Sequence, residues 1–160
     1  MPARDCQEVL FVYGTLLNAE VLEAVIGVRL DPEPATLDGY ERFRVAGAPY
    51  PGIVLAPGAT VRGGLYRGLG ARDLERMDAF EGDLYQRARV SLTIGDGART
   101  PAWTYVVPPE SRALLSNESW DEARYLERDH QDFLARARRD SPAQSQRDGV
   151  GELTGVEEDR

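Results

Sequence analysis

The stretch EVLFVYGTLL, residues 8–17, decides the fold. Its first six residues are mostly apolar and rich in strand formers, and Gly14 closes the run. Asn18 follows as a candidate cap for a helix whose apolar residues, such as Leu22 and Ile26, recur along one face. The stretch therefore predicts a strand, a tight loop and a helix.

Two downstream regions have the composition of strands. Residues 36–68 are punctuated by glycine and proline and alternate in short pieces, which predicts a meander of three strands. Residues 86–95 and 99–107 are joined across Asp96-Gly97, the strongest short-range signal for a hairpin. These regions predict strands that are linked mostly by hairpins.

Two further helices are predicted from apolar spacing. Residues 71–80 place apolar side chains at threefold spacing, so a helix is expected to end near Glu81. A terminal helix opens with Ser119 and Glu122, which have the spacing of a capping box, and an apolar stripe follows. Because helices and hairpin-linked strands are mixed along the chain, the sequence predicts an α+β fold.

The length of 160 residues suits one domain, which we assign to residues 1–140. Residues 141–160 contain few large apolar side chains and many helix breakers, so they are predicted to form a disordered acidic tail. No apolar run approaches the roughly 18 residues that a membrane span requires, so we expect a soluble protein without a membrane partner.

Charge and residue usage exclude several classes of function. The net charge of −8 disfavours binding to nucleic acid, whose phosphates it would repel. All 19 basic residues are arginine, which excludes Schiff-base and other lysine chemistry. Cys6 is the only cysteine and forms no intrachain disulfide, and no long apolar leader precedes it, so we expect a cytoplasmic location.

The turn Tyr13-Gly14-Thr15-Leu16 is a candidate anion site. Gly14 lets the backbone approach a ligand closely, and successive free amides can hold a carboxylate. The same residues also suit a simple turn from strand to helix. Thr15 is a conceivable nucleophile, but no base lies beside it in the sequence. The residues alone leave both interpretations open.

Glu81 is a candidate acid/base because it ends an amphipathic helix directly after Phe80. Desolvation against apolar neighbours and the negative end of the helix dipole both raise the pKa of such a carboxyl group. Asp78 and Asp83 would add like-charge repulsion, weakened by solvent screening. A solvated helix end is the alternative interpretation.

Other polar residues give weaker signals. Tyr85 and Arg87 are two apart at the entry to a predicted strand, so they are expected on one face of the sheet, holding a substrate carboxylate or pairing with local acids. His130, the only histidine, lies on the apolar stripe of the terminal helix and is interpreted as a packing residue. The sequence predicts no metal site and no triad.

Four motifs occur together in a familiar order: FVYGTLL at 11–17, APYPGIVLAPG at 48–58, VRGGLYRGL at 61–69 and DAFEGDLYQRARV at 78–90. In this order the chain closely resembles the gamma-glutamylcyclotransferase-like family, most of all its branch named after avirulence-induced plant proteins. The resemblance covers about residues 8–107. Each motif is weak alone, but four in register are specific.

The resemblance implies a small mixed β-barrel with flanking helices and a ligand pocket at the barrel mouth. It implies that Glu81 is the catalytic acid/base and that a small gamma-glutamyl compound is the substrate, with no cofactor. The residues implied to bind the substrate are Tyr13, Gly14, Thr15, Leu16, Tyr50 and Tyr85.

The implied reaction cyclises the gamma-glutamyl group to 5-oxoproline and releases the amine. Three alternatives stay open at this stage. The first is a non-catalytic ligand-binding module of the same fold. The second is a related acyl-transfer enzyme that acts on gamma-glutamyl intermediates of a biosynthetic pathway. The third is an interaction protein that works through the acidic tail.

Overall fold

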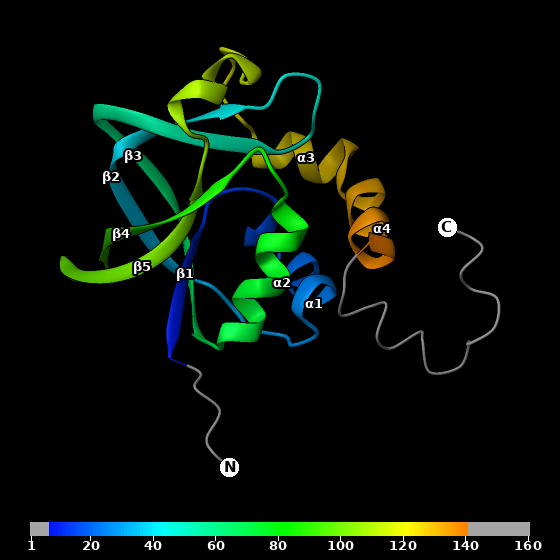
Figure 1. Ribbon diagram of the computed structural model, residues 1–160, viewed down its shortest axis with the longest axis horizontal. Coiled ribbons are helices and arrows are strands. Elements are labelled where there is room, and N and C mark those ends of the chain that lie inside the picture. Colours follow the sequence, from blue (N-terminus) through cyan, green and yellow to red (C-terminus); the bar gives the residue numbers. More distant parts are fainter. Residues whose placement is uncertain (1–6, 141–160) are drawn as a thin grey trace.

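Five strands form a closed barrel in the computed structural model, which describes residues 7–140 (Figure 1). The strands are β1 (Glu8–Val12), β2 (Glu33–Arg44), β3 (Pro51–Leu69), β4 (Gln86–Ile94) and β5 (Ala98–Val106). Their order around the barrel is β1-β3-β2-β4-β5, and β1 closes the ring by pairing antiparallel with β3 and parallel with β5. The predicted α+β class with a small mixed barrel is confirmed.

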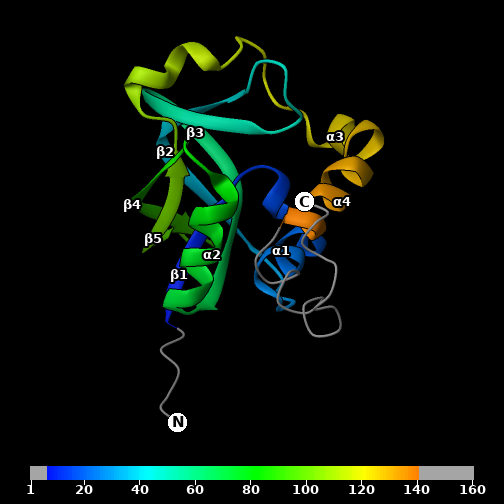
Figure 2. The same cartoon turned by 45° about the vertical axis from the view of Figure 1, so that its right-hand side comes forward.

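The helices gather on one side of this barrel (Figures 1 and 2). They are α1 (Ala19–Ile26), α2 (Ala71–Glu81), α3 (Glu122–Arg128) and α4 (His130–Asp140). Two 3₁₀ helices, η1 (Thr15–Leu17) and η2 (Pro109–Leu114), lie in the connecting segments. Helix α1 contacts both α2 and α4, so it links the helix next to the barrel with the last one. No helix described between residues 7 and 140 is long and apolar enough to cross a bilayer.

Strand β1 is buried on both faces, which explains its continuous apolar run. Leu10 and Val12 face the helices and join the largest core cluster. Phe11 and the adjoining Tyr13 belong to a second cluster with residues of β2 to β5, inside the barrel. The side chains at the end of β1 are therefore fixed in two core clusters before the chain enters the loop.

Several local predictions are confirmed. The Asn18 side chain accepts a hydrogen bond from the Glu20 amide and caps α1, and Gly27 ends the helix with a φ of 83°. The hairpin between β4 and β5 turns at Asp96-Gly97, where Gly97 has a φ of 98°. Helix α2 ends at Glu81, as the apolar spacing predicts.

The prediction of three strands in residues 36–68 is wrong. Two long antiparallel strands, β2 and β3, cover this region, and their register shifts between Asp38 and Tyr40. Asp38 pairs with Thr60 while Tyr40 pairs with Leu55, so the partner strand carries extra residues at this point. Such a bulge accommodates glycine and proline without ending the strand. These residues therefore led to a wrong prediction of additional strand ends.

The prediction of one terminal helix opening at Ser119 is also corrected. Asp121, two residues later, caps α3 by accepting hydrogen bonds from the next amides, and Asp129 separates α3 from α4. The 3₁₀ helix η2 was not predicted. Cys6 and the predicted acidic tail, residues 141–160, lie outside the described residues.

Candidate active site

A small cavity opens where the loop after β1 meets the end of α2, the start of β3 and helix α4. Its volume is about 60 Å³, much less than the roughly 300–1,000 Å³ of pockets for drug-sized ligands, so it suits a short chain. The lining includes all seven site residues predicted from the sequence: Tyr13, Gly14, Thr15, Leu16, Tyr50, Glu81 and Tyr85. The structure therefore brings the two candidate features of the sequence into one site.

The loop requires glycine at position 14. A Cβ atom on Gly14 would lie 2.5 Å from Cγ of Pro51, a contact that real Cβ atoms do not make. The loop then turns through η1, where the Leu17 amide donates to the Gly14 carbonyl. Within the described residues, the amides of Thr15 and Leu16 have no hydrogen-bond acceptor. These donors are available to a ligand in the cavity.

Tyr13 is held at both ends. Its hydroxyl group donates to the Tyr105 carbonyl over 2.6 Å, and its carbonyl accepts from Nη1 of Arg42 over 2.6 Å. Burial, followed by the charge of Glu81, raises the pKa of Tyr13 well above its ordinary value. The phenol therefore stays protonated, and Tyr13 acts as a rigid support at the start of the loop.

Glu81 combines a cavity position with a shifted pKa. Burial raises the pKa of its carboxyl group from 4.5 to about 8, and the nearby charge of Asp78 adds to the rise. The residue as a whole keeps intermediate exposure because it lines the open cavity, while its surroundings desolvate the carboxyl group. No described residue donates a hydrogen bond to this group or forms an ion pair with it. Near neutral pH it can therefore both accept and return a proton.

Asp78 anchors a polar cluster behind Glu81. Its Oδ1 accepts hydrogen bonds from the Tyr105 hydroxyl over 2.6 Å and from Nε of Arg87 over 2.8 Å. The Arg87 guanidinium also lies over the ring of Trp103, at 4.4 Å from its centroid. Of the two interpretations of Arg87, the structure supports pairing with a local acid.

Tyr85 lies directly before β4, at the entry to the strand, and it lines a shallow hollow together with Arg87. The Tyr85 hydroxyl donates to the Pro51 carbonyl over 2.7 Å, and burial raises its pKa. This bond fixes the Tyr85 ring in the cavity wall beside the residue that packs on Gly14.

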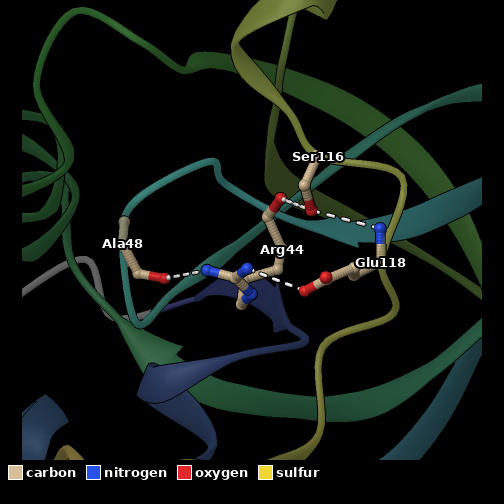
Figure 3. Close-up of polar contacts among 4 residues, drawn as sticks. All are labelled: Arg44, Ala48, Ser116 and Glu118. Atoms are coloured by element: carbon tan, nitrogen blue, oxygen red, sulfur yellow. Dashed lines mark hydrogen bonds and ion pairs between the residues drawn. The ribbon is translucent and has the colours of Figure 1, made fainter.

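Arg44 holds the loop that carries Tyr50 into the cavity (Figure 3). Its Nη1 donates to the Ala48 carbonyl, and its Nη2 pairs with Glu118 over 2.7 Å. The Arg44 carbonyl accepts from the Ser116 hydroxyl and amide. Arg44 therefore ties the loop after β2 to the segment before α3.

The sequence interpretation missed the contribution of α4. Phe133 and Arg136 line the cavity, three residues apart on one face of this helix. Phe133 belonged to the predicted apolar stripe, but nothing in the sequence placed it beside Glu81. His130, as predicted, is a packing residue: it is buried and its ring contacts Tyr125 and Glu20. Residues 7–140 contain no group of three metal-binding side chains.

Comparisons with known proteins agree with this geometry. The family model described as Gamma-glutamyl cyclotransferase, AIG2-like, matches residues 10–122, most of the chain. The chain belongs to this family. Protein AIG2 C of Arabidopsis thaliana is 34% identical over 113 residues, which are 70% of this chain and 68% of that protein.

Solved structures place the AIG2-like chain in the same fold. An Arabidopsis thaliana protein solved in solution has 26% identity and a TM-score of 0.64, and the match covers 98% of this chain and 99% of that one. A structure described as a gamma-glutamyl cyclotransferase has 17% identity and a TM-score of 0.56, covering 64% of this chain and 67% of its own. The match of this AIG2-like chain to its family model contains the loop and Glu81 but ends before α4.

Proposed function

We propose that this chain is a gamma-glutamylcyclotransferase that converts a small gamma-glutamyl conjugate into 5-oxoproline and a free amine. Glu81 is its general acid/base. The observation that carries the proposal is the desolvated carboxyl group of Glu81, with a pKa of about 8, in the same cavity as the open amides of the loop. Family membership supports this type of chemistry.

The reaction needs one proton carrier and one anion site. Ionised Glu81 takes a proton from the α-ammonium group of the substrate, and the freed amine attacks the γ-carbonyl carbon. The new C–N bond closes the five-membered ring, and the bond to the leaving amine breaks. Protonated Glu81 gives its proton to that amine, and the ring nitrogen releases its second proton, which the freed amine takes up as it becomes an ammonium ion, so no net proton is consumed.

The loop supplies the second requirement. In this proposal the amides of Thr15 and Leu16, which line the cavity and have no acceptor among the described residues, donate to the γ-carbonyl oxygen as negative charge develops on it. Tyr13, Tyr50 and Tyr85 form walls that favour the narrow acyl chain of a gamma-glutamyl group. The cytoplasmic location and the lack of a cofactor stay predictions from the sequence.

Purified protein incubated with gamma-glutamyl dipeptides and gamma-glutamyl amines tests the proposal, with 5-oxoproline as the measured product. Glu81→Gln should lower the rate by about 10²–10⁴-fold. Asp83→Asn, at an exposed acid two residues away, is the matched control and should keep the rate of the wild type.

Equal rates for the wild type and Glu81→Gln would contradict the role of Glu81. Binding of gamma-glutamyl compounds without turnover would instead identify a binding module. Transfer of the acyl group to another acceptor would identify the related acyl-transfer enzyme.

A further inference from the structure

Arg42 on β2 binds the loop from outside the cavity. It does not line the cavity, and its Nη1 donates to the carbonyl of Tyr13 over 2.6 Å. The same nitrogen makes a second, longer hydrogen bond of 3.3 Å to the carbonyl of Arg62 on β3. Hydrogen bonds from a charged donor are shorter and stronger than those between neutral groups. Arg42 therefore fixes the point at which the chain leaves β1 and enters the loop.

The surroundings of the Arg42 guanidinium hold it at this point. Its carbon lies 5.6 Å from the centroid of the Trp120 ring, within range of a cation–π interaction. The Trp120 indole donates to the Pro49 carbonyl over 2.7 Å, next to Tyr50 in the cavity wall. Burial lowers the pKa of Arg42, and the negative charge of Glu122 on α3 opposes this effect. The cation is therefore partly desolvated, and it stays charged because arginine is not deprotonated in proteins.

One peptide group connects Arg42 to the cavity. The peptide between Tyr13 and Gly14 is trans, so the Gly14 amide points away from the carbonyl that Arg42 binds. Gly14 lines the cavity, and in the described part of the chain its amide has no hydrogen-bond acceptor. A donor at a carbonyl oxygen polarises the peptide group, which makes the N–H of that group a stronger donor. Arg42 therefore strengthens a third amide of the loop, next to those of Thr15 and Leu16.

We propose that Arg42 is a positioning residue of the cyclisation, which fixes and polarises the Tyr13–Gly14 peptide so that the Gly14 amide donates to the γ-carbonyl oxygen in the transition state. This hydrogen bond strengthens as negative charge develops on the oxygen, so Arg42 acts on the chemical step more than on substrate binding. Arg42 itself touches neither the substrate nor the reacting atoms. This inference rests on the proposed function.

Substitutions of Arg42, assayed with gamma-glutamyl dipeptides, test this role. Arg42→Met removes the charge and the donor but keeps an unbranched stem beside Trp120, and its kcat should fall about tenfold with KM little changed. The factor is smaller than the roughly 10²–10³-fold cost of removing an oxyanion donor itself, because Arg42 acts through a peptide group. Arg42→Lys keeps the charge and a donor and should recover part of the lost kcat. Arg72→Met, at an exposed arginine of α2 that does not line the cavity, is the matched control and should keep the rate of the wild type.

The kinetics separate this role from two others. A wild-type kcat in Arg42→Met would overturn the proposal, and so would a higher KM with kcat unchanged, because that would place Arg42 in ground-state binding. The limb of the pH–rate profile that reports Glu81 should stay in place, since burial and Asp78 raise the pKa of Glu81. A limb that moves in Arg42→Met would overturn the proposal as well, because Arg42 would then act through Glu81.

Amide NMR of the full chain gives a readout that does not depend on turnover. The Gly14 amide proton should move upfield in Arg42→Met, because the peptide group loses its polarising donor, and Arg42→Lys should give an intermediate shift. An unmoved Gly14 resonance would overturn the proposal. If no gamma-glutamyl compound is turned over, the proposed function fails, and this measurement still decides the role of Arg42. If Arg42→Met does not fold, Arg42→Gln replaces it in both measurements and should show losses in the same direction.

Discussion

Replacing Glu81 with glutamine removes a carboxyl group whose pKa burial raises from 4.5 to about 8. Below pH 4.5 this group is protonated in the folded and the unfolded chain alike. As the pH rises from there to 8, the unfolded chain releases the proton more readily than the folded one, so the wild type loses stability. Above pH 8 the loss is complete. Glu81→Gln should not lose this part of its stability.

The size of the effect follows from the shift. The difference between 8 and 4.5 is 3.5 pH units, which corresponds to about 5 kcal/mol of unfolding free energy. Small domains have a total stability of only about 5–15 kcal/mol, so the effect is large enough to measure. The wild type should therefore be markedly less stable than Glu81→Gln at alkaline pH.

Urea unfolding of both proteins at several pH values from about 4.5 to 9 measures this difference. The gap in unfolding free energy should open as the pH rises and level off above pH 8. Glu75→Gln is the control, because Glu75 is an exposed carboxylate on the same helix and the variant has the same change of charge. A gap that stays constant with pH would refute the reasoning that the Glu81 carboxyl group is desolvated.

Three further substitutions test the supports of the site. Gly14→Ala should lower stability by about 1–3 kcal/mol and slow turnover, because its Cβ would meet Pro51; a wild-type urea midpoint and rate would contradict this. Asp78→Asn removes a negative charge near Glu81 and should lower the pKa of Glu81, so the limb of the pH–rate profile that reports Glu81 should move to lower pH. A limb that stays at the same pH would count against the coupling between the two carboxyl groups. His130→Gln breaks hydrogen bonds from α4 to α1 and α3 and should lower the unfolding free energy by about 1–3 kcal/mol; an unchanged urea midpoint would argue against this link.

Predictions from the sequence succeeded where the signal is local. The Asn18 cap, the Asp96-Gly97 turn and the end of α2 at Glu81 each depend on a few neighbouring residues. The continuity of β3 does not, because a strand survives Pro57 and Gly58 only when its partner accommodates a bulge. A single sequence carries no direct signal for such pairing.

The charges around Glu81 were likewise predicted only in part from the sequence. The sequence predicted that Asp78 and Asp83 would both act on Glu81, but the structure assigns the effect to Asp78. Asp78 is three residues before Glu81 in the helix and so lies on the same face, whereas Asp83 follows the end of the helix and is exposed. Helical geometry decided between two acids that look equivalent in sequence.

The property that makes Glu81 a candidate base belongs to the assembled pocket. The motif around residues 78–90 provides the carboxyl group, but burial, the larger cause of its raised pKa, depends on walls from other elements. Tyr50 arrives on the loop held by Arg44, and Phe133 arrives on α4, more than fifty residues after Glu81. A chain with the same motif and a displaced α4 would therefore hold a more acidic Glu81, a weaker proton acceptor near neutral pH.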